Sequence, residues 1–168
     1  TTNAKSAQSV YAVDVDDDGD IDVLSASRED YKISWYENNG SESFTAHTIT
    51  TNANNAISVY AIDVDNDGDI DVLSASRGDD KISWYENNGS ESFTAHTVTN
   101  SADNAYSVFA ADVDGDGQMD ILSASHWDDK IAWYENTTAN SGVSFSAADI
   151  ANSADAATYA FVADLDND

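Results

Sequence analysis

Short runs in which apolar residues alternate with small or polar ones recur along the chain at a regular interval. These runs are rich in Val, Ile, Tyr, Trp and Thr and are bounded by Gly, Asn or Asp, which is typical of β-strands. No window shows an apolar stripe with a helical period over the length of a helix. We therefore expect an all-β protein. The first run of each unit occupies residues 9–14, 58–63, 107–112 and 158–164.

Three further runs follow the first one in each unit. They occupy residues 21–27, 32–38 and 43–50 in the first unit, and their equivalents recur in the next two. An Asn-Gly pair at residues 39–40 and again at 88–89 favours a tight hairpin, because both residue types tolerate positive φ. Four-stranded units of about 40 to 50 residues are typical of β-propeller blades. We therefore predict blades of four antiparallel strands.

The units are spaced by 49 residues, since the Asp that ends the first run recurs at positions 14, 63 and 112. We expect one propeller segment, residues 1–168, with three complete repeats and the start of a fourth. The predicted repeats cover approximately residues 1–50, 51–99 and 100–151, with a partial one at 152–168. A longer hairpin in the third repeat moves the fourth acidic loop to position 164.

An acidic loop separates the first and second runs of every unit. It reads DVDDDGDID at residues 14–22, DVDNDGDID at 63–71 and DVDGDGQMD at 112–120, and the fourth copy begins DLDND at 164–168. Carboxylates this close in sequence repel one another unless a cation lies among them. Hard oxygen ligands at alternating positions, with Gly at the sharp bend, are typical of calcium loops. We predict one Ca²⁺ in each complete repeat.

Comparison of the three complete loops assigns a role to each position. Positions one, three, five and nine are always Asp, so we expect their side chains to bind the ion. Position seven varies between Asp and Gln, as a ligand that uses only its main-chain carbonyl would allow. The predicted metal ligands are Asp14, Asp16, Asp18, Asp20 and Asp22; Asp63, Asp65, Asp67, Asp69 and Asp71; Asp112, Asp114, Asp116, Gln118 and Asp120; and, in the incomplete fourth copy, Asp164, Asp166 and Asp168.

The remaining loop positions predict how the loop is anchored. Position four varies between Asp, Asn and Gly, so we expect it to face solvent, whereas positions two and eight stay apolar and should anchor the loop to the core. An EF-hand is excluded, because position twelve is Ser instead of Glu and lies in a predicted strand. Asp-Gly is also good chemistry for acidic surface turns. That alternative does not account for the fixed ninth Asp.

The motif DxDxDGxxD between two strands resembles the FG-GAP-like, or VCBS-type, repeats, which are related to the calcium-binding blades of the integrin α-subunit propeller. The resemblance covers nearly the whole chain. It implies that the loop joins the first two strands of a blade and binds Ca²⁺ through the Asp positions given above. The literal Phe-Gly and Gly-Ala-Pro elements are missing, and the chain has no Pro. We therefore expect the bacterial-type branch of the family.

Composition restricts the partners. Thirty-two Asp and Glu residues face six Lys and Arg, for a formal net charge of −26. Such a surface repels DNA, RNA and anionic lipid, so we expect neither a nucleic-acid partner nor membrane insertion. The chain has no Cys and therefore neither a disulfide nor a thiolate metal site. Acidity of this degree suits a calcium-rich exterior, and we expect a secreted or cell-surface protein.

Aromatic and basic residues provide further candidates. A Trp-Tyr pair recurs in the third run of each unit, and we expect core packing between blades, with a sugar-stacking platform as the alternative. Trp127 replaces Glu29 and Gly78 in a polar turn and is the best candidate for an exposed ligand contact, together with its neighbour His126. His126 shares its position with two arginines, for which an ion pair with the following Asp is the competing interpretation. We expect His47 and His96 to be exposed strand residues.

These observations favour a calcium-stabilised propeller segment that is not an enzyme and serves as a binding, adhesion or assembly module. Its partner would be a protein, a glycan or further copies of the chain. The alternatives are an accessory propeller of a larger polysaccharide-active enzyme, or a lectin with one sugar site per blade. The resemblance implies a propeller that closes with about seven blades. The segment is therefore expected to belong to a longer protein, to assemble into a ring or filament, or to stand alone.

Overall fold

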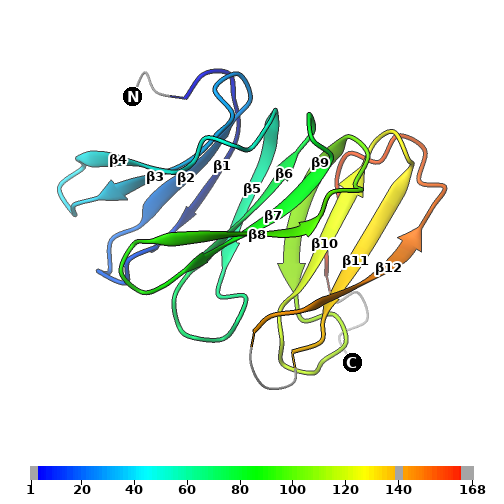
Figure 1. The fold of residues 1–168 in the computed structure, drawn as a ribbon. Helices are drawn as coiled ribbons and strands as arrows, with labels where there is room; N and C mark the ends of the chain where they lie inside the picture. Colours follow the sequence, from blue (N-terminus) through cyan, green and yellow to red (C-terminus); the bar gives the residue numbers. More distant parts are fainter. Residues whose placement is uncertain (1–3, 139–141, 164–168) are drawn as a thin grey trace.

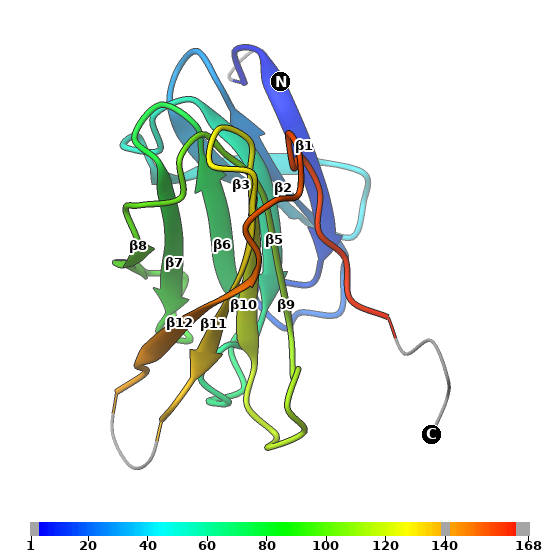
Figure 2. The same ribbon diagram turned by 90° about the vertical axis from the view of Figure 1, so that its right-hand side faces the viewer.

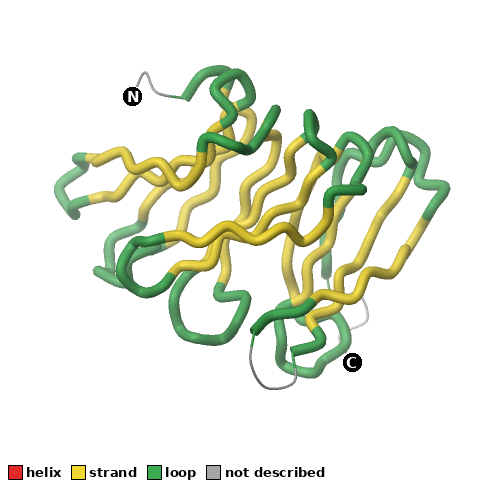
Figure 3. Tube along the Cα trace, viewed as in Figure 1, coloured by secondary structure: helices red, strands yellow, loops and turns green. Residues whose placement is uncertain are grey.

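The computed structural model describes residues 4–138 and 142–163, and within them it is all-β (Figures 1 and 3). Three four-stranded antiparallel sheets follow one another along the chain, and each joins consecutive strands in sequence order. The predicted blades of four antiparallel strands are confirmed. The first sheet contains β1 (Ala7–Val13), β2 (Asp22–Ser27), β3 (Lys32–Asn38) and β4 (Phe44–Thr50).

The second and third sheets repeat this arrangement 49 residues further on. The second contains β5 (Ala56–Ile62), β6 (Asp71–Ser76), β7 (Lys81–Asn87) and β8 (Phe93–Thr99). The third contains β9 (Ala105–Ala111), β10 (Asp120–Ser125), β11 (Lys130–Asn136) and β12 (Phe145–Ala151). Register is preserved: Val10 lies opposite Ser25 in the first sheet, as Val59 lies opposite Ser74 in the second. We call the three sheets blades 1, 2 and 3.

Tight turns close the β3–β4 and β7–β8 hairpins at the predicted Asn-Gly pairs. Gly40 and Gly89 both adopt a φ of 70°, a left-handed conformation that glycine reaches without steric cost. The side chain of Asp20 lies against Gly40, and that of Asp69 lies against Gly89, in the space that a Cβ would occupy. These glycines are therefore required both by the turn and by the close approach of the acidic loop.

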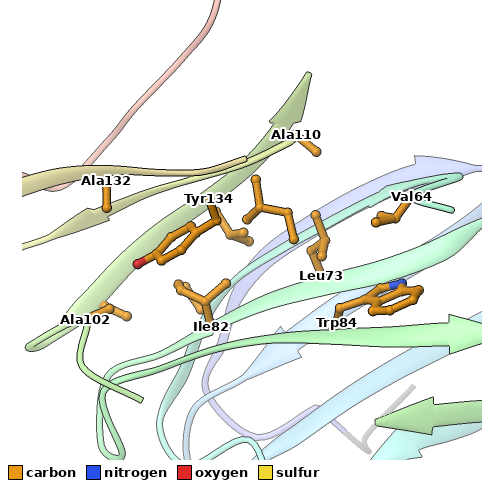
Figure 4. Packing of buried hydrophobic residues seen from close by; sticks show 12 residues of the cluster. Val64, Leu73, Ile82, Trp84, Ala102, Ala110, Ala132 and Tyr134 are labelled. Carbon is orange, nitrogen blue, oxygen red and sulfur yellow. The ribbon is translucent and has the colours of Figure 1, made fainter. Parts of the chain in front are cut away.

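The blades pack face to face, and two apolar clusters fill the spaces between them (Figures 1 and 2). Between blades 1 and 2, Leu24, Ile33 and Trp35 meet Val59 and Tyr85. Between blades 2 and 3, Leu73, Ile82 and Trp84 meet Val108 and Tyr134 in the same way (Figure 4). Blade 2 thus uses one face toward blade 1 and the other toward blade 3.

The segment that follows blade 3 starts as the earlier blades start. The N–H of Ala154 donates to the carbonyl of Asp129, as that of Ala102 donates to the carbonyl of Asp80. The ring of Phe161 is tilted against that of Phe109, with 5.4 Å between ring centroids. It extends the row that Tyr11, Tyr60 and Phe109 form along β1, β5 and β9. The described part of the expected run 158–164, residues 158–163, forms no strand. The described residues contain no helix that could cross a membrane.

Candidate metal centres

Each acidic loop joins the first two strands of its blade, as the sequence predicts, and the three loops lie at the same end of the blades (Figure 1). Position four is left-handed in every copy, with φ of 59° at Asp17, 62° at Asn66 and 78° at Gly115. Asp, Asn and Gly are the residue types that adopt this conformation most readily. Asp17 and its equivalents are exposed, as predicted. The left-handed backbone at position four explains why the three loops have Asp, Asn and Gly there.

The first Asp of each loop folds the loop around its own carboxylate. One oxygen accepts the N–H of the glycine at position six, at 2.9 Å for Asp14 with Gly19, and the same distance recurs in loops two and three. The other oxygen of Asp14 is buried and has no hydrogen-bond donor among the described residues. An orphaned buried carboxylate oxygen is costly unless a cation or water meets it.

Three of the predicted ligands converge in each complete loop. In loops one and three the carboxylate oxygens of positions one, three and five lie within 4.8 Å of one another, from Asp14, Asp16 and Asp18 and from Asp112, Asp114 and Asp116. In loop two the converging residues are Asp63, Asp65 and Asp71. Closely spaced hard oxygen donors suit a calcium-sized cation. The donor set and the orphaned oxygen of Asp14 therefore fit such an ion.

The ninth Asp has a structural role that sequence comparison did not reveal. Asp22 is fully buried, and its two oxygens accept the N–H groups of Val15 at 3.1 Å and Asn38 at 2.7 Å. Asp71 and Asp120 repeat both contacts in their blades. This carboxylate therefore fastens the loop to the third strand. The Asn that always lies sixteen residues after it was the available signal.

Positions five and seven share one hydrogen bond in all three loops, and loop three adds a second one. The side chain of position five accepts the N–H of position seven at 2.8 to 2.9 Å in all three loops. In loop three, the amide of Gln118 also donates to the second oxygen of Asp116 at 3.0 Å. That oxygen has no such donor in loops one and two, where an Asp occupies position seven. The predicted ligands Asp164, Asp166 and Asp168 lie outside the described residues.

Comparison with known sequences places the chain in a family. The FG-GAP-like repeat family matches residues 14–74, 63–123 and 113–168. The chain belongs to the FG-GAP-like repeat family. A solved structure of similar fold concerns specific recognition of non-reducing terminal N-acetylglucosamine by a lectin of Agrocybe aegerita. It shares 20% sequence identity at a TM-score of 0.56, and the match covers 83% of this chain but only 38% of that one. No curated protein sequence matches the chain.

Burial and mutual repulsion raise the pKa of several carboxylates in these FG-GAP-like loops. Burial, with the nearby charge of Asp67, raises the pKa of Asp65 to about 6. Burial raises the pKa of Asp71 to about 7, although the N–H groups of Asn87 and Val64 oppose this shift. The pKa of Asp16 is raised chiefly by burial and then by Asp22 and Asp18. Such shifts are expected where carboxylates converge without a counter-charge.

The apolar anchors of the loops are buried only where another blade covers them. Val15 and Val64, at position two, are buried against the following blade, whereas Val113 is 39% exposed. At position eight, Ile70 packs against the core between blades 1 and 2, whereas Ile21 is exposed. The expectation that both positions anchor every loop is therefore wrong for Val113 and Ile21. No described blade covers them.

The predicted contact residue Trp127 is 66% exposed, which confirms that it faces solvent. His126, by contrast, is half-buried and tilts against Tyr106 at 5.6 Å between ring centroids. The expected ion pair between this position and the following Asp is wrong, because Asp128 pairs with Lys130 at 3.7 Å. Lys32 and Lys81 make the equivalent pairs in blades 1 and 2. His126 and Trp127 are therefore neighbours in sequence but do not form one exposed patch.

His47 and His96 lie in strands, as predicted, but they are partly buried instead of fully exposed. His47 stacks on Trp35 at 4.5 Å and contacts Glu37 at 2.8 Å, and His96 repeats this arrangement with Trp84 and Glu86. Each histidine covers the outer side of an indole that is buried between blades. Trp35 and Trp84 are thus core residues, as expected, and their rings are not open sugar-stacking platforms.

Proposed function

We propose that the chain is a calcium-stabilised propeller segment, secreted or on the cell surface, that serves as a non-catalytic binding, adhesion or assembly module. The observation that carries the proposal is the convergence of carboxylate oxygens within 4.8 Å in each of the three complete loops. Without a cation these groups repel one another, and this repulsion adds to burial, the larger cause, in raising the pKa values of Asp16, Asp65 and Asp71. A bound Ca²⁺ would remove this repulsion and cross-link the loop.

The Asp side chains at positions one, three, five and nine would hold the ion, with the main-chain carbonyl of position seven. Calcium supplies charge neutralisation and coordination here, which are structural contributions. In loop one, Oδ2 of Asp14 already accepts the N–H of Gly19, so its Oδ1 is the oxygen available to the ion. Because extracellular modules typically bind Ca²⁺ with a Kd of about 10⁻⁴ to 10⁻³ M, such loops need a calcium-rich exterior.

An assembly role is supported by the uncovered face of blade 1. Val10 and Phe44 are exposed there, along a groove of about 560 Å³ that Tyr36 also lines. On blades 2 and 3 the equivalent face is covered by the preceding blade. We propose that a blade of the same type covers it, from another copy or from a longer chain. Gel filtration with light scattering would detect a second copy, and a monomer unchanged at high concentration would exclude one.

Calcium titration tests the main proposal. Isothermal titration calorimetry of the chelator-treated chain should give about three sites, one for each complete loop. At free Ca²⁺ of about one hundred times Kd, each loop should add about 2.7 kcal/mol to the free energy of unfolding. Three matched variants, Asp16→Ala, Asp65→Ala and Asp114→Ala, each lack one proposed ligand and should each lose one calcium site. An unfolding temperature that is the same in calcium and in chelator would contradict the proposal.

The second candidate function is that of a lectin, which binds a glycan. An accessory propeller of a polysaccharide-active enzyme would also contact a glycan. The similarity in fold to a lectin supports it, together with a groove of about 420 Å³ between blades 2 and 3. Asp65, Glu86 and His96 line this groove and offer hydrogen-bonding groups to hydroxyls. A glycan array in calcium, with N-acetylglucosamine as the first soluble competitor, tests this candidate. No binding to any glycan would remove it.

A further inference from the structure

A series of hydrogen bonds leads from the first acidic loop to the second through the asparagine that ends β7. The side-chain Nδ2 of Asn87 donates to the carbonyl of Val15, at 3.5 Å and across 72 residues of sequence. The main-chain N–H of Asn87 donates to Oδ1 of Asp71 at 2.7 Å. The other oxygen of Asp71 accepts the N–H of Val64 at 3.1 Å. Position two of loop one is thereby connected to positions two and nine of loop two.

The same series continues from the second loop to the third. Nδ2 of Asn136 donates to the carbonyl of Val64 at 3.3 Å, again across 72 residues. Its main-chain N–H donates to Oδ1 of Asp120 at 2.8 Å, and Oδ2 of Asp120 accepts the N–H of Val113 at 3.1 Å. Val64 is therefore held from both sides, by the ninth Asp of its own loop and by the asparagine of the next blade.

Burial makes these bonds effective. Asn87, Asn136, Asp71 and Asp120 are all buried, so water does not compete for their polar groups. Hydrogen bonds in such surroundings are stronger than at the surface, and an unpaired partner is costly. Displacement of one buried partner therefore disturbs the next one in the series.

Asn38 shows what the same residue does without a preceding blade. Its N–H donates to Oδ1 of Asp22 at 2.7 Å, as in the other blades. Its side chain, however, makes hydrogen bonds only within its own blade, to the carbonyl of Ile21 at 3.1 Å and from the N–H of Gly40 at 3.2 Å. Asn87 and Asn136 make the equivalent contact and add the contact to the preceding loop. The extra bond is thus a property of the interface between blades.

We propose that Asn87 and Asn136 are positioning residues that couple calcium binding in one loop to calcium binding in the next. The inference rests on the proposed function, in which these loops bind Ca²⁺. An ion in loop two fixes Asp71, Asp71 holds the backbone of Asn87, and the side chain of Asn87 orients the carbonyl of Val15. Val15 lies between Asp14 and Asp16, so loop one is preorganised for its own ion. The coupling is reciprocal, because each ion must favour the other equally.

The series of hydrogen bonds has a direction. Each asparagine donates to the loop of the preceding blade, at 3.5 Å from Asn87 and at 3.3 Å from Asn136. Among the described residues, no side chain donates to the carbonyl of Val113, which is also the most exposed of the three position-two valines. Loop three also has a direct bond to loop two, because Nδ2 of Asn66 donates to the carbonyl of Gly117 at 3.2 Å.

Site-resolved calcium titration tests the coupling. The amide resonances of Gly19, Gly68 and Gly117 report separately on the three loops in ¹⁵N-labelled protein. Asp114→Ala should remove the loop-three site and weaken binding at loop two by about two- to tenfold, as expected for loss of one hydrogen bond. In an Asn136→Ala background the same change should leave loop two unaffected. Asp65→Ala with Asn87→Ala makes the equivalent test for loops one and two.

Asn38→Ala is the matched control, because it removes an equivalent asparagine that makes no contact with another loop. It should leave the coupling between all loops unchanged. Equal effects of Asp114→Ala with and without Asn136 would overturn the proposal, as would loops that titrate independently in the unmodified chain. Should one asparagine variant fail to fold, the other carries the test for its own pair of loops. Loss of all calcium binding would instead contradict the proposed function.

Discussion

Blades 1 and 2 have nearly the same sequence but very different surroundings. Val10 of β1 is 70% exposed, whereas the equivalent Val59 of β5 is 4% exposed. Phe44 is exposed on blade 1, and its equivalent Phe93 packs against the core between blades 1 and 2. The chemistry of the side chains is identical, so the preceding blade alone accounts for the difference. A blade is therefore a unit of folding whose stability depends on its neighbours.

The largest effect on the free energy of unfolding should come from a charge placed at the position that Val10 and Val59 share. Val59→Asp buries an unpaired carboxylate in the core between blades 1 and 2, which should lower the free energy of unfolding by about 3 to 5 kcal/mol. Val10→Asp places the same charge on an exposed face and should change it by less than about 0.5 kcal/mol. Urea denaturation of both variants measures the difference. Equal losses would show that the face of blade 1 is covered in solution.

The acidic loop of the covered blade should make metal-free stability depend on pH. The pKa of Asp71 is about 7 in the folded chain, against an ordinary value of 3.8, and that of Asp65 is about 6. Between the ordinary pKa and the raised pKa of these carboxylates, the folded state binds more protons than the unfolded state. The free energy of unfolding therefore falls as the pH rises from about 4 to 7. In chelator, the unfolding temperature should be higher at pH 5 than at pH 7.5.

Calcium should reverse this dependence, because the ion binds ionised carboxylates and therefore stabilises the chain more at pH 7.5 than at pH 5. Asp71→Asn is the control, since an amide does not titrate, and it should make the profile in chelator less steep, with the remaining dependence coming from Asp65. Thermal unfolding followed by circular dichroism measures each profile. A metal-free unfolding temperature that rises from pH 5 to pH 7.5 would show that these carboxylates are not the groups that titrate.

The smallest effect concerns the turn between the second and third strands. Tyr31 occupies a left-handed position, φ 57°, where blades 2 and 3 have Asp80 and Asp129. Asp80 and Asp129 each accept a main-chain N–H from the next segment at 2.8 Å, which a Tyr side chain does not provide. Tyr31→Asp should therefore stabilise the chain by about 1 kcal/mol and raise its unfolding temperature by about 2 to 4 °C. Asp80→Tyr should have the opposite effect.

Much of the fold could be predicted because each blade repeats the same local signals. The alternation of apolar with small or polar residues predicted the strands, and the Asn-Gly pairs predicted two hairpin turns. The interval between the acidic loops predicted the length of the repeat. The convergence of positions one, three and five also followed from spacing in loops one and three. The two hydrogen bonds that Asp22 accepts could not be predicted from this spacing. Their donors, the N–H groups of Val15 and Asn38, lie seven and sixteen residues from Asp22 and are brought to it by the fold of the blade.

The sequence by itself determined the identity of each strand, the acidic loop between the first two strands and the residues that converge there, because these depend on neighbours within one repeat. Only the tertiary structure decided which copies of a residue are buried. Val10, Val59 and Val108 are equivalent in sequence, yet burial follows from the presence of a preceding blade. The bonds from Asn87 and Asn136 to the preceding loops have the same origin, because only stacked blades bring groups 72 residues apart into contact.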